Sequence, residues 1–146
     1  MNILVDTNVL LRLRGAEPTP RGALDDALER LVNRGDLLQL CTQVVIEFWS
    51  VATRPVDANG LGLAPAAAET RLRHFTTLLV WLPEPADIGH GWRALVNRYN
   101  VRGKQVHDAR LVAFMEAHGL THLLTLNTAD FARYTTITAL HPNDVK

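Results

Sequence analysis

The sequence predicts an α/β fold in which a mostly parallel sheet of about five strands is flanked by helices. Short apolar runs alternate with longer amphipathic segments, and several runs are almost continuously apolar, as in strands that helices cover on both faces. Parallel neighbours need crossover connections, which the amphipathic segments provide. Ligands of such sheets bind beyond the carboxyl ends of the strands, so polar residues at those ends are the first candidates for a site.

Each strand is predicted from a short apolar run, and each helix from apolar residues spaced three to four apart. Gly119 follows the last amphipathic segment and is expected to end that helix, because glycine readily takes the left-handed conformation found there. Two irregular segments, 15–22 and 54–64, are expected to be loops. The expected strands are 3–5, 37–41, 78–82, 122–126 and 136–140, and the expected helices are 7–14, 23–33, 43–53, 65–76, 86–99 and 105–118.

Length and composition fit one domain spanning 1–146, because 146 residues with 47% hydrophobic side chains can bury a core. Fifteen Lys and Arg balance fifteen Asp and Glu, so nucleic-acid binding would have to rely on local charge. The single cysteine, Cys41, excludes a disulfide framework and a cysteine zinc cluster. No apolar stretch approaches membrane-spanning length and the start lacks a signal-peptide pattern, so we expect a cytoplasmic protein without membrane contact.

Three carboxylates far apart in the sequence are candidates for one metal site. Asp6 follows the first strand directly, although helix capping alone would explain it. Glu47 lies at the border of an apolar helix face, where its head group alone could simply reach water. Asp108 shares the apolar face of its own helix, and a core-facing charge needs a partner. If the three converge, a cation would offset their repulsion, and all-oxygen ligands favour Mg²⁺ or Mn²⁺ over zinc.

A fourth polar segment follows the strand expected at 122–126. Asn127 and Asp130 both fall near its carboxyl end, and capping alone would account for either of them. The six histidines form no zinc-type pair on one helical face. Only His107, next to Asp108, is kept as a possible substrate contact.

Four segments stand in a known order and spacing: ILVDTNVLL, VVIEFWSVATRP with the following NGLGL, VHDARLVAFMEAHG and LLTLNTADF. Together they resemble the PIN-domain ribonucleases, and specifically the VapC toxins of bacterial toxin–antitoxin pairs. The resemblance covers almost the whole chain and implies that Asp6, Glu47 and Asp108 bind metal. The family often has an acid in the place of Asn127. We favour Asp130 as the fourth catalytic and metal-binding carboxylate, with Asn127 as a water or phosphate contact.

The resemblance implies a metal-dependent endoribonuclease that uses Mg²⁺, for which Mn²⁺ can substitute. Water activated by the metal would attack a phosphate of a structured RNA of the tRNA or rRNA class. Thr7, Asn8 and Thr125 match the family's small polar residues and would orient the acids. The expected protein partners are a cognate VapB-like antitoxin and a second copy of the chain, giving a homodimer. The two-faced segments 23–31 and 64–79 either form such an antitoxin groove or belong to the core.

Positive charge gathers around the loop before the Asp108 helix. Such groups would contact RNA phosphates beside the metal site, although a solvated loop explains them equally well. Arg12 and Arg14, which follow the Asp6 turn, are further candidates. The expected RNA contacts are Arg98, Arg102, Lys104, His107 and Arg110.

Two other classes of protein place acids at the strand ends of a parallel sheet. A receiver-type signalling domain needs an acid pair after the first strand and a lysine after a later one, whereas Thr7 and Asn8 follow Asp6 and the only lysines are Lys104 and Lys146. A haloacid-dehalogenase-like phosphatase needs an aspartate where Asn8 stands. Both are excluded. The remaining alternative is a catalytically weak PIN domain that binds RNA or protein without cutting.

Overall fold

Five parallel strands form the central sheet, in the order β3-β2-β1-β4-β5. The computed structural model describes residues 1–13 and 20–146. It confirms the expected α/β class and the mostly parallel sheet of about five strands. The strands are β1 (Asn2–Val5), β2 (Leu37–Leu40), β3 (Val80–Trp81), β4 (His122–Leu124) and β5 (Thr138–Leu140).

The order of the strands creates a reversal beside β1. The chain moves from β1 to β2 and β3 on one side, then returns to place β4 and β5 on the other. Ile3 pairs in register with Leu38 on one neighbour and with His122 on the other. A reversal of this kind leaves a crevice at the carboxyl ends of the two strands that flank it, here β1 and β4.

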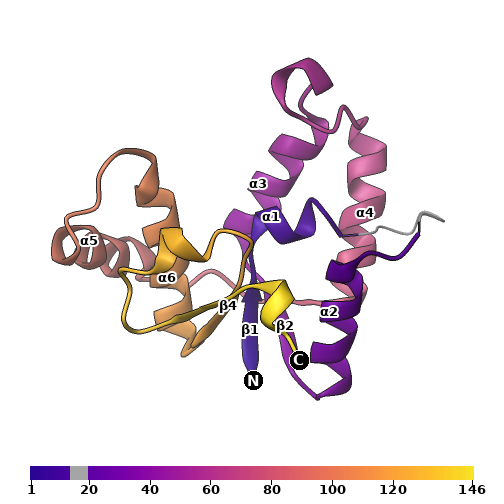
Figure 1. Cartoon of the computed structure of the whole chain (residues 1–146). Coiled ribbons are helices and arrows are strands. Elements are labelled where there is room, and N and C mark those ends of the chain that lie inside the picture. The colour runs from indigo at the N-terminus through magenta and orange to yellow at the C-terminus, as the bar shows by residue number, and fades with distance from the viewer. Residues whose placement is uncertain (14–19) are drawn as a thin grey trace.

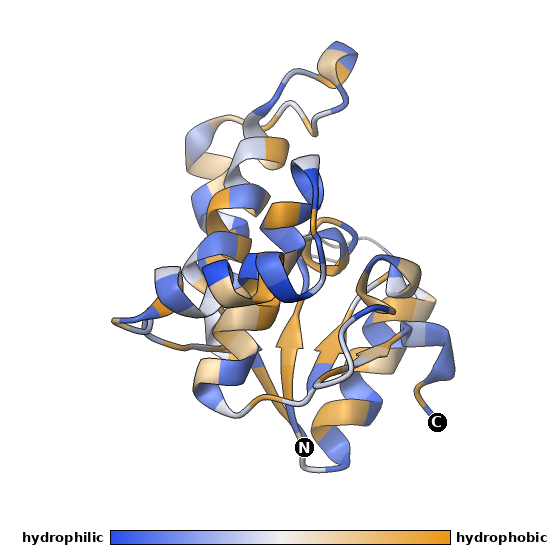
Figure 2. Cartoon of the chain, turned by 90° about the vertical axis from the view of Figure 1, so that its left-hand side faces the viewer, coloured by the Kyte–Doolittle hydropathy of each residue, from blue (hydrophilic) through white to orange (hydrophobic). Residues whose placement is uncertain are grey.

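Helices enclose the sheet. In Figure 1, α2 and α4 lie on one side of the strands and α5 and α6 on the other. Figure 2 shows the apolar strands in the middle, where Ile3, Leu4 and Val5 are fully buried, as their continuous apolar run predicts. The helices are α1 (Thr7–Leu10), α2 (Ala23–Asn33), α3 (Thr42–Thr53), α4 (Pro65–Leu78), α5 (Ile88–Arg98) and α6 (Val106–His118).

Local sequence signals account for several element ends. Pro65 occupies the first turn of α4, where its missing N–H costs no helical hydrogen bond. Gly119 has a φ of 67° and ends α6, as expected. Gly60 lies in the loop after α3, and a Cβ there would come within 1.9 Å of the Arg54 carbonyl oxygen, so only glycine fits this turn.

Several elements are shorter than expected, among them the strands expected over 122–126 and 136–140, which are β4 and β5. The helix expected over 7–14 is shorter, because α1 ends at Leu10; Arg14 and most of the loop expected at 15–22 lie outside the described residues. The strand expected over 78–82 includes only Val80–Trp81 (β3), because α4 continues to Leu78. Within the described residues no helix is both long enough and apolar enough to cross a bilayer.

The pair of helices α3 and α4 is joined by an aromatic contact in the core. The rings of Phe48 and Phe75 meet edge to face, with centroids 5.4 Å apart, and both side chains are buried. The packing of these helices therefore depends on two neighbouring rings.

Replacing Phe75 with alanine should remove this contact and leave a cavity. We expect Phe75→Ala to lower the free energy of unfolding by about 3–5 kcal/mol, measured by urea denaturation. Leu78→Ala on the same helix is the control, because Leu78 is 58% exposed and its truncation should change stability by less than about 0.5 kcal/mol. Equal losses in the two variants would contradict the assignment of Phe75 to the core.

Candidate functional site

Asp6 occupies the carboxyl end of β1 and is held there by its neighbours. Its backbone N–H donates to the carbonyl of Leu124 at 3.0 Å, which ties it to β4. The backbone N–H of Thr7 donates to Asp6 Oδ1 at 2.7 Å. The side chains of Thr125 and Asn8 donate to Asp6 Oδ2 at 2.7 and 3.0 Å. Asp6 therefore caps α1 and also points into the crevice beside β4.

The environment of Asp6 opposes its ionisation. Burial is the main cause that raises the pKa of this carboxyl, and the negative charge of Glu47 raises it further. The hydrogen bonds from Thr125, Thr7 and Asn8 act in the opposite direction without cancelling the effect of burial. Only 8% of the residue is exposed. Asp6 is thus a buried carboxylate whose charge lacks full compensation.

Glu47 reaches the same edge of the sheet from α3. Thr7 Oγ1 donates to Glu47 Oε2 at 2.9 Å, and Gln43 Nε2 donates to Glu47 Oε1 at 3.0 Å. The side chain is half-buried, whereas Phe48 beside it is fully buried. Glu47 lies at the border of the apolar face, and its carboxylate is directed by hydrogen bonds instead of reaching freely into water.

Asp108 lies in the first turn of α6 and faces the other acids. Its pKa is raised to about 6, first by burial and then by the negative charges of Asp130, Asp6 and Glu47, while His107 acts weakly in the opposite direction. Residues from four distant segments therefore repel one another across one edge of the sheet.

Asn127 and Asp130 both lie in the turn after β4. Asp130 lies in the short 3₁₀ helix Thr128–Phe131, and its charge is the strongest of the three that act on Asp108. Both side chains are exposed. The backbone N–H of Asn127 donates to Thr125 Oγ1 at 3.1 Å, which fixes the start of the turn. The charge of Asp130 therefore acts on Asp108, and its assignment as the fourth acid stays a prediction.

The chemistry of these donors fits a hard divalent cation. All are oxygens, and each Glu47 oxygen accepts one hydrogen bond, which leaves a lone pair available. None of the ion pairs within residues 1–13 and 20–146 includes Asp6, Glu47, Asp108 or Asp130. Across the same residues, no three side chains of His, Cys, Asp or Glu stand close enough to hold a metal as they are. Mg²⁺ usually keeps several water ligands and binds through one or two carboxylates, so the acids as they stand would hold it mainly through water.

The basic residues expected to contact RNA, which lie before and within the first turns of α6, divide into two groups. Arg98, Arg102, Lys104 and His107 are exposed, as phosphate contacts would need to be, and remain predictions. Arg110 also stays a prediction, and the structure gives it two protein partners. Its guanidinium donates to Gln43 Oε1 at 3.0 Å and also pairs with Glu84, while about a third of its side chain remains exposed.

Sequence reasoning missed Gln43. This residue is buried, and it links Glu47 to the backbone of α6 by donating to the carbonyl of His107 at 2.9 Å. The available signal was its position one helical turn before Glu47, where side chains on a helix meet.

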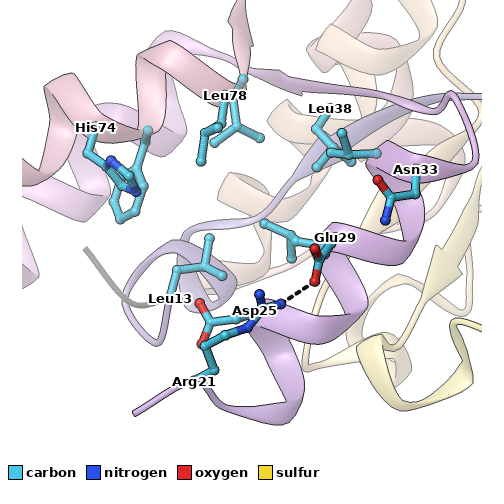
Figure 3. A pocket seen from close by; sticks show the side chains of 12 residues that line it. Leu13, Arg21, Asp25, Glu29, Asn33, Leu38, His74 and Leu78 are labelled. Atoms are coloured by element: carbon cyan, nitrogen blue, oxygen red, sulfur yellow. Dashed lines mark hydrogen bonds and ion pairs between the residues drawn. The ribbon is translucent and has the colours of Figure 1, made fainter. Parts of the chain in front are cut away.

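A separate groove runs between α2 and α4 (Figure 3). Its buried floor is formed by Leu28, Leu38, Phe75 and Leu79. Val32 and Leu78 are 51% and 58% exposed beside it. Arg21, which pairs with Glu29, lies near the start of α2, and His74 faces the groove from α4. Both two-faced segments of the sequence therefore contribute to the core and to one exposed apolar groove.

The sequence and the fold of this chain are similar to those of known proteins. The sequence profile of the PIN domain matches residues 3–136. No curated protein matches the chain in sequence. The chain superposes on one chain of the VapBC2 complex from Rickettsia felis, a complex that is bound to a promoter DNA fragment. The TM-score is 0.74 and the sequence identity is 15%, over 97% of this chain and 98% of that chain. It superposes on VapBC-1 from nontypeable Haemophilus influenzae with a TM-score of 0.71 and 16% identity over 98% and 99%.

A third structure extends the likeness to a toxin on its own. It is VapC20 from Mycobacterium tuberculosis, described as cleaving the sarcin–ricin loop, with a TM-score of 0.53 and 20% identity over 83% of this chain and 86% of that chain. At these identities the superpositions show a shared fold.

Asp108 should make stability depend on pH in the absence of divalent metal. Because its folded pKa of about 6 exceeds its usual 3.8, the folded chain holds this proton more strongly. The free energy of unfolding should therefore fall as pH rises through that interval. Asp108→Asn should reduce this fall, while Asp6 continues to contribute to it, and should raise stability at pH 7 by about 1–2 kcal/mol, allowing for solvent around a half-buried group.

Urea denaturation in chelator between pH 4 and pH 7 measures this effect. Asp57→Asn, at an exposed acid on another part of the surface, is the matched control and should leave the free energy of unfolding within about 0.5 kcal/mol. A loss of stability at pH 7 in Asp108→Asn would show that the carboxylate is compensated in the folded chain.

Proposed function

Since this chain belongs to the PIN domain family, we propose that it is a Mg²⁺-dependent endoribonuclease toxin that cleaves structured RNA and is inhibited by a cognate antitoxin. The observation that carries this proposal is the group of acids at one edge of the sheet. Asp130, Asp6 and Glu47 together raise the pKa of Asp108, so a cation would relieve a repulsion that the fold maintains.

Asp6, Glu47, Asp108 and Asp130 are the residues that would hold Mg²⁺ or Mn²⁺. The bound cation would supply a water of lowered pKa and a positive charge for the phosphate oxygens. The chain's own residues orient the acids: Thr125 and Asn8 fix Asp6, and the Thr7 hydroxyl fixes Glu47. No side-chain nucleophile is needed for hydrolysis of this kind.

RNA would approach over the start of α6. Arg98, Arg102, Lys104 and His107 are exposed there and would contact phosphates beside Asp108. The formal net charge of the whole chain is zero, so this binding should be modest and sensitive to salt. The tRNA or rRNA class is the substrate implied by the motif resemblance, and the sarcin–ricin loop belongs to that class.

The groove between α2 and α4 is the proposed antitoxin site. An amphipathic helix would place its apolar face on the floor formed by Leu28 and Phe75 and its polar face toward solvent. Two of the superposed structures are VapBC complexes, which supports a partner of the VapB type.

Metal-dependent cleavage is the direct test. The purified chain should cut RNA with Mg²⁺ or Mn²⁺ and stop in chelator. Asp6→Asn and Asp108→Asn should each lower the rate by about 100-fold or more, since even partners of metal ligands cost about 10- to 100-fold. Glu69→Gln, at an acid paired with Arg73 on the exposed face of α4, is the matched control and should cut normally. Cleavage that persists in chelator would rule out the metal mechanism.

The same assay decides the fourth acid. Asp130→Asn should lose most of the activity and Asn127→Ala should keep most of it. Of these two residues, only Asp130 carries a negative charge that acts on Asp108. The reverse result would assign the fourth position to Asn127. RNA binding without cleavage in every condition would support a catalytically weak PIN domain instead.

The groove has its own test. When the product of a neighbouring short reading frame is co-expressed, it should co-purify with the chain. Val32→Asp and Leu78→Asp should each weaken that complex by about 10-fold or more. When the partner covers the groove, the new carboxylate would be buried without an opposite charge. Val56→Asp, at a residue 73% exposed away from the groove, is the control for an added charge. Unchanged affinity in both groove variants would place the antitoxin elsewhere.

A further inference from the structure

Four side chains form a continuous line from the surface to Glu47. Glu84 pairs with the guanidinium of Arg110. Arg110 donates to Gln43 Oε1 at 3.0 Å, and Gln43 Nε2 donates to Glu47 Oε1 at 3.0 Å. The exposed fraction falls from about a third at Glu84 and Arg110 to 8% at Gln43, and Glu47 beyond it is half-buried. A buried amide thus joins a charged pair at the rim to a candidate metal ligand.

The Gln43 amide uses its full set of donors. One Nε2 hydrogen goes to Glu47 Oε1 and the other to the carbonyl of His107 at 2.9 Å. Its oxygen accepts from Arg110. A flipped amide would set oxygen against a carboxylate and a carbonyl, and nitrogen against a guanidinium, so all three contacts impose the same orientation.

The two donors of Gln43 reach different elements of the site. Glu47 lies on α3, whereas His107 is the residue immediately before Asp108 on α6. One side chain therefore fixes the direction of one acid and the approach of the helix that carries another.

We propose that Gln43 is a positioning residue that sets Glu47 and the first turn of α6 relative to each other, and that Arg110, anchored by Glu84, locks its amide. This inference rests on the proposed function, because it assigns the network to the same metal site. It also gives Arg110 a role other than RNA contact. Hydrogen-bonded partners of metal ligands commonly change metal affinity by about 10- to 100-fold.

Two variants that preserve net charge test the network. Gln43→Met keeps the length of the side chain and removes both donors and the acceptor. Arg110→Lys keeps the charge but loses the fork that serves Glu84 and Gln43 together. Arg73→Lys is the matched control. Like Arg110, Arg73 pairs with a glutamate, here Glu69, but both side chains lie on the exposed face of α4. All three should be verified as folded by circular dichroism.

The first readout is the Mn²⁺ dissociation constant, measured by calorimetry without RNA. It should rise by about 10-fold or more in Gln43→Met, by a smaller factor in Arg110→Lys, and not at all in Arg73→Lys. The second readout is amide hydrogen exchange in the metal-free chain. Exchange over residues 106–112 should become several-fold faster in Gln43→Met, because the link to the His107 carbonyl is gone.

The outcomes separate this inference from the proposed function. If the unaltered chain binds Mn²⁺ and both network variants bind it equally well, the positioning role is overturned and the nuclease proposal stands. If the unaltered chain fails to bind Mn²⁺, both are overturned. Should Gln43→Met prove unfolded, the milder Arg110→Lys decides the question against Arg73→Lys.

Discussion

The hydrogen bond from Thr125 to Asp6 is the interaction on which the site depends. It joins residues 119 positions apart at the carboxyl ends of β1 and β4, the two strands on either side of the reversal in strand order. The parallel register of these strands brings the two side chains together, and Asn8 links to both. The remaining acids then reach this fixed point from α3, from α6 and from the turn after β4.

This arrangement places like charges in a partly buried space, which works against folding. Burial and mutual repulsion both raise the pKa of Asp108, and a structure selected only for stability would not bring acids together in this way. Sites that bind charged ligands often carry such a cost, because the ligand supplies the missing opposite charge. The hydrogen bonds from Thr7, Asn8 and Thr125 reduce the cost at Asp6 and Glu47.

Local sequence patterns were sufficient for the features that local chemistry controls. Apolar runs located all five strands, and α2 matches its expected bounds. Asp6 was found because a strand ends beside it. The lengths of α1, β3, β4 and β5 were misjudged, since element boundaries depend on tertiary packing as well as on local sequence.

The network around Gln43 could not be found in this way. An amide in an apolar helix looks like an ordinary boundary residue, and an arginine near other basic residues looks like part of a phosphate-binding surface. Only the spatial approach of α3 to α6 shows that Arg110 faces Gln43, and that distance is not encoded in any local pattern. The sequence already favoured Asp130 over Asn127, and the structure adds that the charge of Asp130 acts on Asp108.

The edge-to-face contact of Phe48 with Phe75 packs α3 against the residues that form the groove floor. Phe75 belongs to the floor of the groove, while Phe48 is adjacent to Glu47 in sequence. Residues that share a packed contact do not contribute independently to stability or binding. Substitutions of Phe48 and Phe75 should therefore show non-additive effects on stability, so a double-mutant measurement has to accompany any comparison of single variants at this contact.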